Sequence, residues 1–248
     1  VSERQIEVLR SLYDGQVSYV DSCLKELIEY LEFLDVFDNT LLIVTSDHGD
    51  LLGEHGLFAH QFVLYEPLTK VPLILRFPNA FLGGKRYSGL VQTLDILPTL
   101  MDYLGIEWAD VSREIQGISL LKLMEGEEGR EFTISERSDW SPKINKKKIA
   151  YLRTKYPSFD WEKYSHEIIA VRTKEYEYIW SSEGRHELYD LMRDPQESNN
   201  VISTENEKAC DLRSKLDRWK SSFVPAAPAV GKSDLEMSAK RLRALGYL

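Results

Sequence analysis

The sequence predicts an α/β fold: part of a mostly parallel sheet with flanking helices, followed by a small α+β subdomain with an antiparallel sheet and a C-terminal helix. Two observations predict the first part. A long helical stripe occupies residues 2–33, and a short strand that is almost entirely apolar follows at 40–45. Such a strand is typical of a parallel sheet covered on both faces. Alternating and aromatic strands after residue 129 predict the second part.

The first helix is expected over residues 2–33, where apolar side chains recur at steps of three and four residues. Ser2 is a suitable cap for its first turn. The strand at 40–45 comes next, and a second strand is expected at 70–77. Pro72 places that second strand at a start or at a sheet edge, because proline has no N–H to donate.

A second helix is expected to run to residue 104, with Thr93 or Asp95 as its cap and Gly105 as its end. Residues 116–124 form a short apolar element, and the Glu/Gly-rich run at 125–129 is the expected boundary. We therefore divide the chain into residues 1–128, which hold the α/β part, and residues 129–248, the antiparallel-sheet and helix subdomain; the resemblance described below implies that residues 1–128 are the C-terminal part of a larger core and include a metal-binding loop.

The second domain is predicted to hold short antiparallel strands and an amphipathic helix. The strands are expected at 131–136, 168–172, 176–180 and 187–191, the helix at 206–223, and further helical structure near 235–245. Four aromatic residues on these strands could form a sugar-binding face, but packing against the 206–223 helix is the preferred interpretation. They are Tyr176, Tyr178, Trp180 and Tyr189.

Composition narrows the function. The net charge is −9, and the basic run at 143–148 is interpreted as a solvated loop, so no nucleic-acid partner is expected. No apolar stretch reaches about 18 residues, so no membrane span is expected. Cys23 and Cys210 are too few for a disulfide framework and are interpreted as buried thiols on helical stripes.

The chain begins at Val1 and carries no signal-peptide segment. That absence favours a cytoplasmic location, but the natural N-terminus is expected to lie upstream because no initiator Met is present. The compartment is therefore not fixed by the sequence.

Candidate site residues cluster directly after the 40–45 strand. Three of the five histidines, His48, His55 and His60, lie there with Asp47, Asp50 and Glu54. Ligands of open α/β sheets bind beyond the carboxyl ends of the strands. Carboxylates beside imidazoles at such a place can hold a metal ion. An Asp–His pair that caps a helix and binds its own loop fits the same spacing, so the residues alone leave both interpretations open.

The stretch at 39–60 resembles the second signature region of the sulfatase family, which belongs to the alkaline-phosphatase superfamily. The resemblance continues downstream in the order of the family. Similar segments lie at 64–66, 70–74, 92–100, 116–121, 187–191 and 194–200. It implies an alkaline-phosphatase-like core and a sulfuric ester hydrolase that cleaves sulfate esters at one divalent cation, usually Ca²⁺.

The resemblance also implies roles for single residues. Asp47 and His48 correspond to two ligands of the cation. His60 stands where the family carries a lysine that contacts the sulfate, so it is expected to bind substrate. A protonated imidazole can donate to an anionic ester, and a neutral one can instead bind a second metal ion, as in two-metal phosphoesterases. His55 and Glu54 are expected to orient the loop or a carboxylate near the ion.

The family's nucleophile is absent. It lies in a cysteine/serine-x-proline-x-arginine motif, which neither Cys23, Cys210 nor Ser141 fits. The aspartate pair that completes the metal ligands in the family is absent too. The chain therefore resembles only the C-terminal half of a sulfatase, contains no catalytic nucleophile of its own, and is expected to be inactive alone.

Three hypotheses follow. The chain is the C-terminal portion of a sulfatase that uses Ca²⁺; or it belongs to a two-metal phosphodiesterase or phosphonate hydrolase that uses Zn²⁺ or Mn²⁺; or it is a non-catalytic truncated fragment. The expected partner is a small-molecule sulfate or phosphate ester, whose organic part the sequence does not specify. An isolated half-domain would leave a core edge exposed, so self-association through that edge is also expected.

Overall fold

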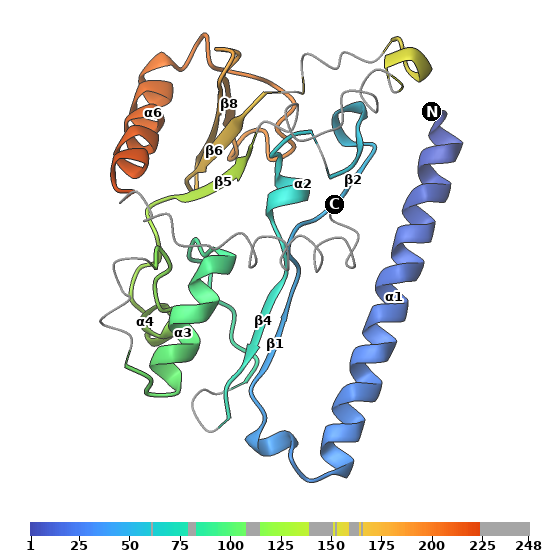
Figure 1. Ribbon diagram of the computed structural model, residues 1–248, viewed down its shortest axis with the longest axis vertical. Helices are drawn as coiled ribbons and strands as arrows, with labels where there is room; N and C mark the ends of the chain where they lie inside the picture. The colour runs from blue at the N-terminus through green and yellow to red at the C-terminus, as the bar shows by residue number, and fades with distance from the viewer. Residues whose placement is uncertain are drawn as a thin grey trace, which may run out of the picture. The chain divides into compact units, whose positions relative to one another are not determined.

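A computed structural model describes residues 1–60, 62–78, 83–107, 115–138, 151, 153–158, 164 and 166–223 (Figure 1). The chain forms two compact units, Val1–Ser214 and Lys215–Leu248, and the contacts described below lie within the first. The basic run at 143–148 and the expected helix near 235–245 lie outside the described residues. The domain boundary near residue 128 stays a prediction.

The first helix, α1 (Glu3–Phe33), begins as the sequence predicts. The Gln5 side chain accepts from the Ser2 N–H at 2.8 Å, and the Ser2 hydroxyl accepts from the Gln5 N–H at 3.4 Å, which is a capping box. Its apolar stripe is not buried in the structure: no residue of α1 is classed as buried. Leu12 is 61% exposed and Val20 63%.

The strand predicted at 40–45 is present as β1 (Leu42–Thr45), after a short 3₁₀ turn, η1 (Phe37–Asn39). Its partner is β4 (Leu73–Arg76), which begins directly after Pro72, as predicted. The pair is antiparallel, with Leu42 opposite Arg76, whereas a parallel neighbour was expected. Neither strand has a third neighbour among the described residues, and β1 is accordingly half-buried or exposed rather than covered on both faces.

Between β1 and β4 the chain forms a small hairpin and one helical turn. The elements are β2 (Leu51–Leu52), η2 (Glu54–Gly56), β3 (Phe58–Ala59) and α2 (Glu66–Thr69). Leu51 lies opposite Ala59 and Leu52 opposite Phe58 in the hairpin. Because Leu51 and Leu68 are buried in the main hydrophobic core, the hairpin and α2 are held firmly beside the end of β1.

The next helical segment comprises η3 (Thr93–Asp95) and α3 (Ile96–Tyr103), and α4 (Leu121–Glu125) follows. Gly105 follows α3 with a φ of +64°, as its expected role at the helix end requires. The expected cap of α3 by Asp95 is not found. The fully buried Asp95 carboxylate instead accepts from the Gln92 and Ile118 N–H groups, both at 2.9 Å, and pairs with Arg130.

The predicted antiparallel sheet is confirmed. It contains β5 (Thr133–Arg137), β6 (Ile168–Arg172), β7 (Tyr176–Ser181) and β8 (Glu187–Asp190), each antiparallel to the next. Helix α6 (Asn206–Ser221) follows the sheet in the chain, and its residues 206–214 belong to the same unit as the sheet.

The aromatic strand residues divide between the two faces of the sheet. The Lys208 ammonium lies 5.6 Å from the Tyr176 ring, and the Arg213 guanidinium 5.9 Å from the Trp180 ring, so β7 does pack its aromatic face against α6 as predicted. Tyr189 differs, because it belongs to the main core together with Ile179, whose side chain alternates with Tyr178 and Trp180 along β7.

Cys23 and Cys210 are free and exposed, so their interpretation as buried thiols is wrong. The reason for Cys23 is that α1 buries none of its residues. Within the described part of the chain, no helix combines the length and the apolar character that crossing a membrane requires.

Candidate metal centre

The loop that follows β1 is shaped by short local hydrogen bonds. The Ser46 hydroxyl donates to the His48 carbonyl at 2.6 Å, and Asp47 Oδ1 accepts from the His48 N–H at 3.0 Å. Asp47 Oδ2 then lies 3.9 Å from His48 Nε2, and the Asp47 side chain is 60% exposed. The two residues to which the resemblance assigns a cation therefore present an oxygen and a nitrogen close together and open to solvent.

Gly49 fixes this loop against α2. The Gly49 N–H donates to the Leu68 carbonyl at 2.9 Å. A Cβ at position 49 would lie 2.0 Å from the Pro67 carbonyl oxygen, so no other residue fits without a backbone shift. Helix α2 thus supports the residue that follows His48.

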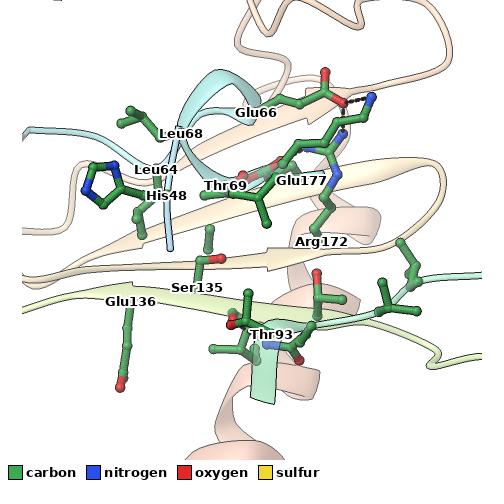
Figure 2. A pocket seen from close by; sticks show the side chains of 18 of the residues that line it. His48, Leu64, Glu66, Leu68, Thr69, Thr93, Ser135, Glu136, Arg172 and Glu177 are labelled. Carbon is green, nitrogen blue, oxygen red and sulfur yellow. Dashed lines mark hydrogen bonds and ion pairs between the residues drawn. The ribbon is translucent and has the colours of Figure 1, made fainter. Parts of the chain in front are cut away.

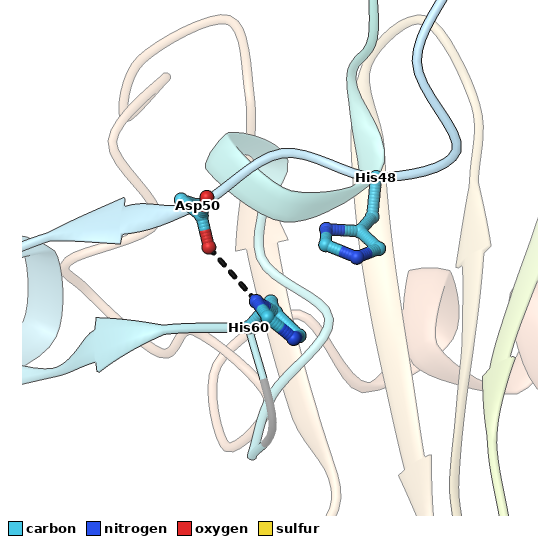
Figure 3. A group of neighbouring side chains, drawn as sticks. All are labelled: His48, Asp50 and His60. Carbon is cyan, nitrogen blue, oxygen red and sulfur yellow. Dashed lines mark hydrogen bonds and ion pairs between the residues drawn. The ribbon is translucent and has the colours of Figure 1, made fainter. Parts of the chain in front are cut away.

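Asp50 and His60 face each other across the β2–β3 hairpin. They flank the paired residues Leu51 and Ala59, and His60 Nδ1 lies 2.9 Å from Asp50 Oδ1 (Figure 3). The His60 ring centroid is 4.2 Å from that of His48. One ligand atom from each of His48, Asp50 and His60 lies within 4.8 Å of the others. Sequence reasoning noted Asp50 only as a neighbour; the hairpin register is the signal that could have assigned it.

His55 and Glu54 lie outside this cluster. The His55 ring stacks on Tyr65 at 3.8 Å between centroids, and the Glu54 carboxylate accepts from the Leu52 N–H at 2.5 Å and pairs with Arg10 at 3.1 Å. Both residues therefore anchor the loop, Glu54 to α1 and His55 to the core.

Tyr65, on which the His55 ring stacks, is itself bound to the sheet. The Tyr65 and Tyr189 hydroxyls both donate to Glu187 Oε2, at 2.9 and 2.7 Å. Burial and then the charge of Glu187 raise the pKa of both tyrosines, so the hydroxyls stay protonated and both bonds persist at ordinary pH.

Asp47, His48 and His60 are among the residues that line a cleft of about 760 Å³. Its walls come from α2, β5, β6 and residues 87–93 (Figure 2). A cleft of this size suits a small ligand, and the aspartate and imidazole donors in its lining fit a divalent cation.

A partly buried charged cluster lies around Arg172, whose side chain lines the cleft together with those of Glu66 and Glu177 (Figure 2). Arg172 pairs with Glu177, with Glu66 at 3.0 Å and with Glu197 at 3.4 Å, while Glu197 also accepts from the Glu66 N–H at 2.7 Å. Burial and the neighbouring Glu197 raise the pKa of Glu177 well above its usual value. Sequence reasoning missed this cluster, because Glu66 and Glu197 lie 106 and 25 residues from Arg172 in the chain and no pattern connects them.

Comparison with known proteins now gives the family. Residues 53–221 match the family described as N-sulphoglucosamine sulphohydrolase, C-terminal. An N-acetylglucosamine-6-O-sulfatase from Bacteroides thetaiotaomicron is 34% identical over 93% of this chain, and the chain spans 39% of that protein.

Solved structures agree with this match. A solved structure described as a complex with its substrate D-glucosamine-2-N,6-O-disulfate has 28% identity and a TM-score of 0.66, over 83% of this chain and 39% of that one. The phosphonate monoester hydrolase of Agrobacterium radiobacter shares the fold, with a TM-score of 0.68 at 22% identity, over 89% of this chain and 42% of that one.

Fold and site together define the C-terminal region of a sulfatase-like protein with the alkaline-phosphatase fold. The chain belongs to the N-sulphoglucosamine sulphohydrolase C-terminal family. It spans about two fifths of the length of the curated relative above.

Proposed function

We propose that this chain is the C-terminal portion of a sulfatase that hydrolyses sulfate esters at a divalent-cation site. The observation that carries the proposal is that Asp47 and His48 both line the cleft, within a chain whose named relatives are sulfatases. The named relatives act on or bind sulfated glucosamine sugars, so a sulfated amino sugar is the substrate class to test first.

In this proposal Asp47 and His48 hold the cation, for which the resemblance gives Ca²⁺. When bound, such a cation supplies charge neutralisation for the nucleophile and the ester oxygens. The side chains of this chain hold that ion, line the cleft and orient the ester within it. Gly49 and α2 keep the two ligand residues at the cleft, because the Gly49 N–H is bound to the Leu68 carbonyl. The nucleophile would come from outside these 248 residues, since the expected motif is absent here.

The test uses the complete parent polypeptide, with and without conversion of its nucleophile to formylglycine. We expect release of inorganic sulfate from glucosamine-6-sulfate by the converted protein only. Asp47→Asn should lower this activity by a factor of about 10² or more, because it removes a charged ligand. The control is Glu183→Gln, at an exposed position outside the cleft. Absence of sulfate release under both conditions would refute the proposal.

A phosphonate or phosphate ester hydrolase is the second candidate. The observation that favours it is the second imidazole, His60, beside His48, together with the fold shared with phosphonate monoester hydrolases. It predicts cleavage of a phenylphosphonate ester faster than of the sulfate ester, with Zn²⁺ or Mn²⁺ added. Comparing the kcat/KM values of the same protein for the two esters decides between the candidates.

The 248 residues alone are expected to be inactive and to self-associate. Support comes from α1, which carries exposed Leu12, Val17 and Val20 on one helix. Sedimentation of the chain over a range of concentrations tests this expectation, and a monomer at every concentration would contradict it.

A further inference from the structure

We propose that Glu197 is a positioning residue for the loop that carries Asp47 and His48, and that it acts through α2. The inference deepens the proposed function, on which it rests for the metal-binding role of that loop. Its basis is a series of hydrogen bonds from the turn at 194–200 to α2 and from α2 to the loop. The first of these bonds joins two residues that are 131 positions apart in the chain, Glu66 and Glu197.

The Glu197 carboxylate supplies the cap that α2 lacks. Glu66 is the first residue of α2, so its N–H has no partner inside the helix, and Tyr65 before it provides no side-chain cap. Glu197 Oε2 accepts from that N–H at 2.7 Å. A hydrogen bond to a carboxylate is among the strong ones, and a helix of four residues does not persist without contacts from outside. The placement of α2 therefore depends on Glu197.

Arg172 holds the same carboxylate through its other oxygen. One guanidinium nitrogen of Arg172 lies 3.4 Å from Glu197 Oε1. The other lies 3.0 Å from Glu66 Oε1, so a single arginine contacts both residues of the Glu66–Glu197 bond (Figure 2). The Glu197 side chain is 0% exposed, and water therefore does not compete for its oxygens. With a partner at each oxygen, the carboxylate has a fixed orientation toward α2.

The backbone at Glu197 is strained, and the contacts around it determine its conformation. Its φ of +55° lies in the left-handed region that favours glycine. The Glu197 N–H donates to the Asp194 carbonyl at 3.1 Å, and Asp194 Oδ2 accepts from the Asn199 N–H at 2.7 Å. Asn200 Oδ1 accepts from the Leu188 N–H at 3.0 Å and so ties the turn to β8. A strained residue persists only where its surroundings hold it, and here they present its carboxylate to α2.

Helix α2 in turn contacts the loop at Gly49, directly after His48. The Gly49 N–H donates to the Leu68 carbonyl at 2.9 Å. A Cβ at position 49 would lie 2.0 Å from the Pro67 carbonyl oxygen, so the backbones of the loop and of α2 are in direct contact. Close-packed segments of this kind move together. Loss of the Glu197 contact therefore frees the start of α2 and loosens the support of His48.

A positioning role and a purely structural role of Glu197 differ in the amides that they protect. If Glu197 only stabilises the fold, its removal speeds hydrogen exchange equally at all amides that exchange through global unfolding. If it positions α2, its removal promotes a local opening. The Gly49 amide, which is bonded to α2, then exchanges faster while the amides of β7 change little.

The experiment measures amide hydrogen exchange by NMR in the full 248-residue chain, without metal or substrate. Glu197→Ala removes a charged acceptor and is expected to speed exchange at Gly49 by at least about 10-fold. The amides of β7 should speed up by less than about threefold. Glu197→Gln retains an acceptor oxygen without the charge, so its effect at Gly49 should be smaller than that of Glu197→Ala.

The control is Val171→Ala, which destabilises the sheet from its other face. Val171 is fully buried in β6, and it points away from Arg172 because side chains alternate along a strand. This variant should speed exchange at Gly49 by no more than in β7. An effect at Gly49 that only matches the effect in β7, in either Glu197 variant, would overturn the inference. If Glu197→Ala does not fold, the comparison of Glu197→Gln with Val171→Ala decides alone.

A second measurement separates this inference from the proposed function. In the complete parent polypeptide, Glu197→Gln is expected to weaken Ca²⁺ binding about 10-fold, because residues that hold metal ligands in place have effects of this size. Unchanged Ca²⁺ affinity together with unchanged kcat/KM would overturn the positioning role, even if exchange at Gly49 rises. A parent that cleaves no sulfate ester would refute the proposed function alone, since neither the exchange measurement nor the Ca²⁺ titration depends on turnover.

Discussion

Helix α1 and the β5–β8 sheet differ in how far their apolar side chains are buried. The sheet buries both faces. Val171 and Leu188 are 0% exposed, residues 206–214 of α6 contact the aromatic face of β7, and α2 and the β2–β3 hairpin pack on the other face. Helix α1 has no fully buried residue, and the best-covered side chains of its apolar stripe are only half-buried: Ile6, Tyr13, Leu24, Ile28 and Leu31. The periodicity of a sequence therefore predicts which face of a helix is apolar. It does not predict whether another segment packs on that face.

The largest expected effect lies in the charged cluster of the sheet. Arg172→Ala leaves the buried Glu177–Glu197 pair, which shares one proton and keeps a negative charge, without its cation, and it is expected to lower the free energy of unfolding by about 3–5 kcal/mol. Urea unfolding followed by circular dichroism measures this loss. A loss below about 1 kcal/mol would mean that the cluster is not desolvated in solution.

A matched pair of leucines tests the comparison directly. Leu188→Ala in β8 is expected to destabilise the chain by about 2–5 kcal/mol, because Leu188 is fully buried. Leu12→Ala in α1 should change stability by no more than about 0.5 kcal/mol, because its side chain is exposed. Equal losses at both positions, measured by the same urea titration, would show that the α1 face is covered in solution.

The pH dependence of stability gives a third, smaller contrast. Folding raises the pKa of Glu177 above its usual value of 4.5, so the folded chain retains a proton that the unfolded chain releases. The stability that this proton provides is fully present below the unfolded pKa and is lost as pH rises through the folded pKa. Glu177→Gln keeps the neutral form at every pH. Unfolding titrations between about pH 5 and pH 8 should therefore fall more steeply for the wild type than for this variant. Parallel profiles would contradict the raised pKa.

The smallest effect is expected at the point where α1 meets the β2–β3 hairpin. Arg10 donates to the Leu52 carbonyl and pairs with Glu54, but its side chain is about half exposed. Arg10→Ala should lower the free energy of unfolding by only about 0.2–1 kcal/mol. A loss comparable to that of Arg172→Ala would show that α1 is held to the hairpin far more strongly than the exposed contact implies.

Much of the fold could be predicted from the sequence because the relevant patterns are local. The capping box at Ser2, the alternation in β7 and the glycine after α3 each act within a few residues. The antiparallel β1–β4 pair could not be predicted, since a continuous apolar strand does not specify the direction of its neighbour. The exposure of Cys23 depends in the same way on what covers α1.

The candidate site was predictable in part. Asp47, His48 and His60 stood out through residue type and position, and they do line one cleft. Asp50 required the hairpin register, and Arg172 with Glu177 and Glu197 required contacts between segments distant in the chain. Motif reasoning finds residues that the chemistry requires, whereas the residues that hold them in place follow from tertiary packing.

The β2–β3 register has a consequence for how this segment can vary. Side chains alternate sides along a strand, so Asp50 meets His60 only because five residues, 53–57, separate Leu52 from Phe58. A single insertion or deletion in that turn would rotate His60 to the other side of the hairpin while leaving every residue type intact. The number of residues in the turn is therefore under tighter constraint than most of their identities. Homologous chains that differ in length here would have to be compared as chains with a different site.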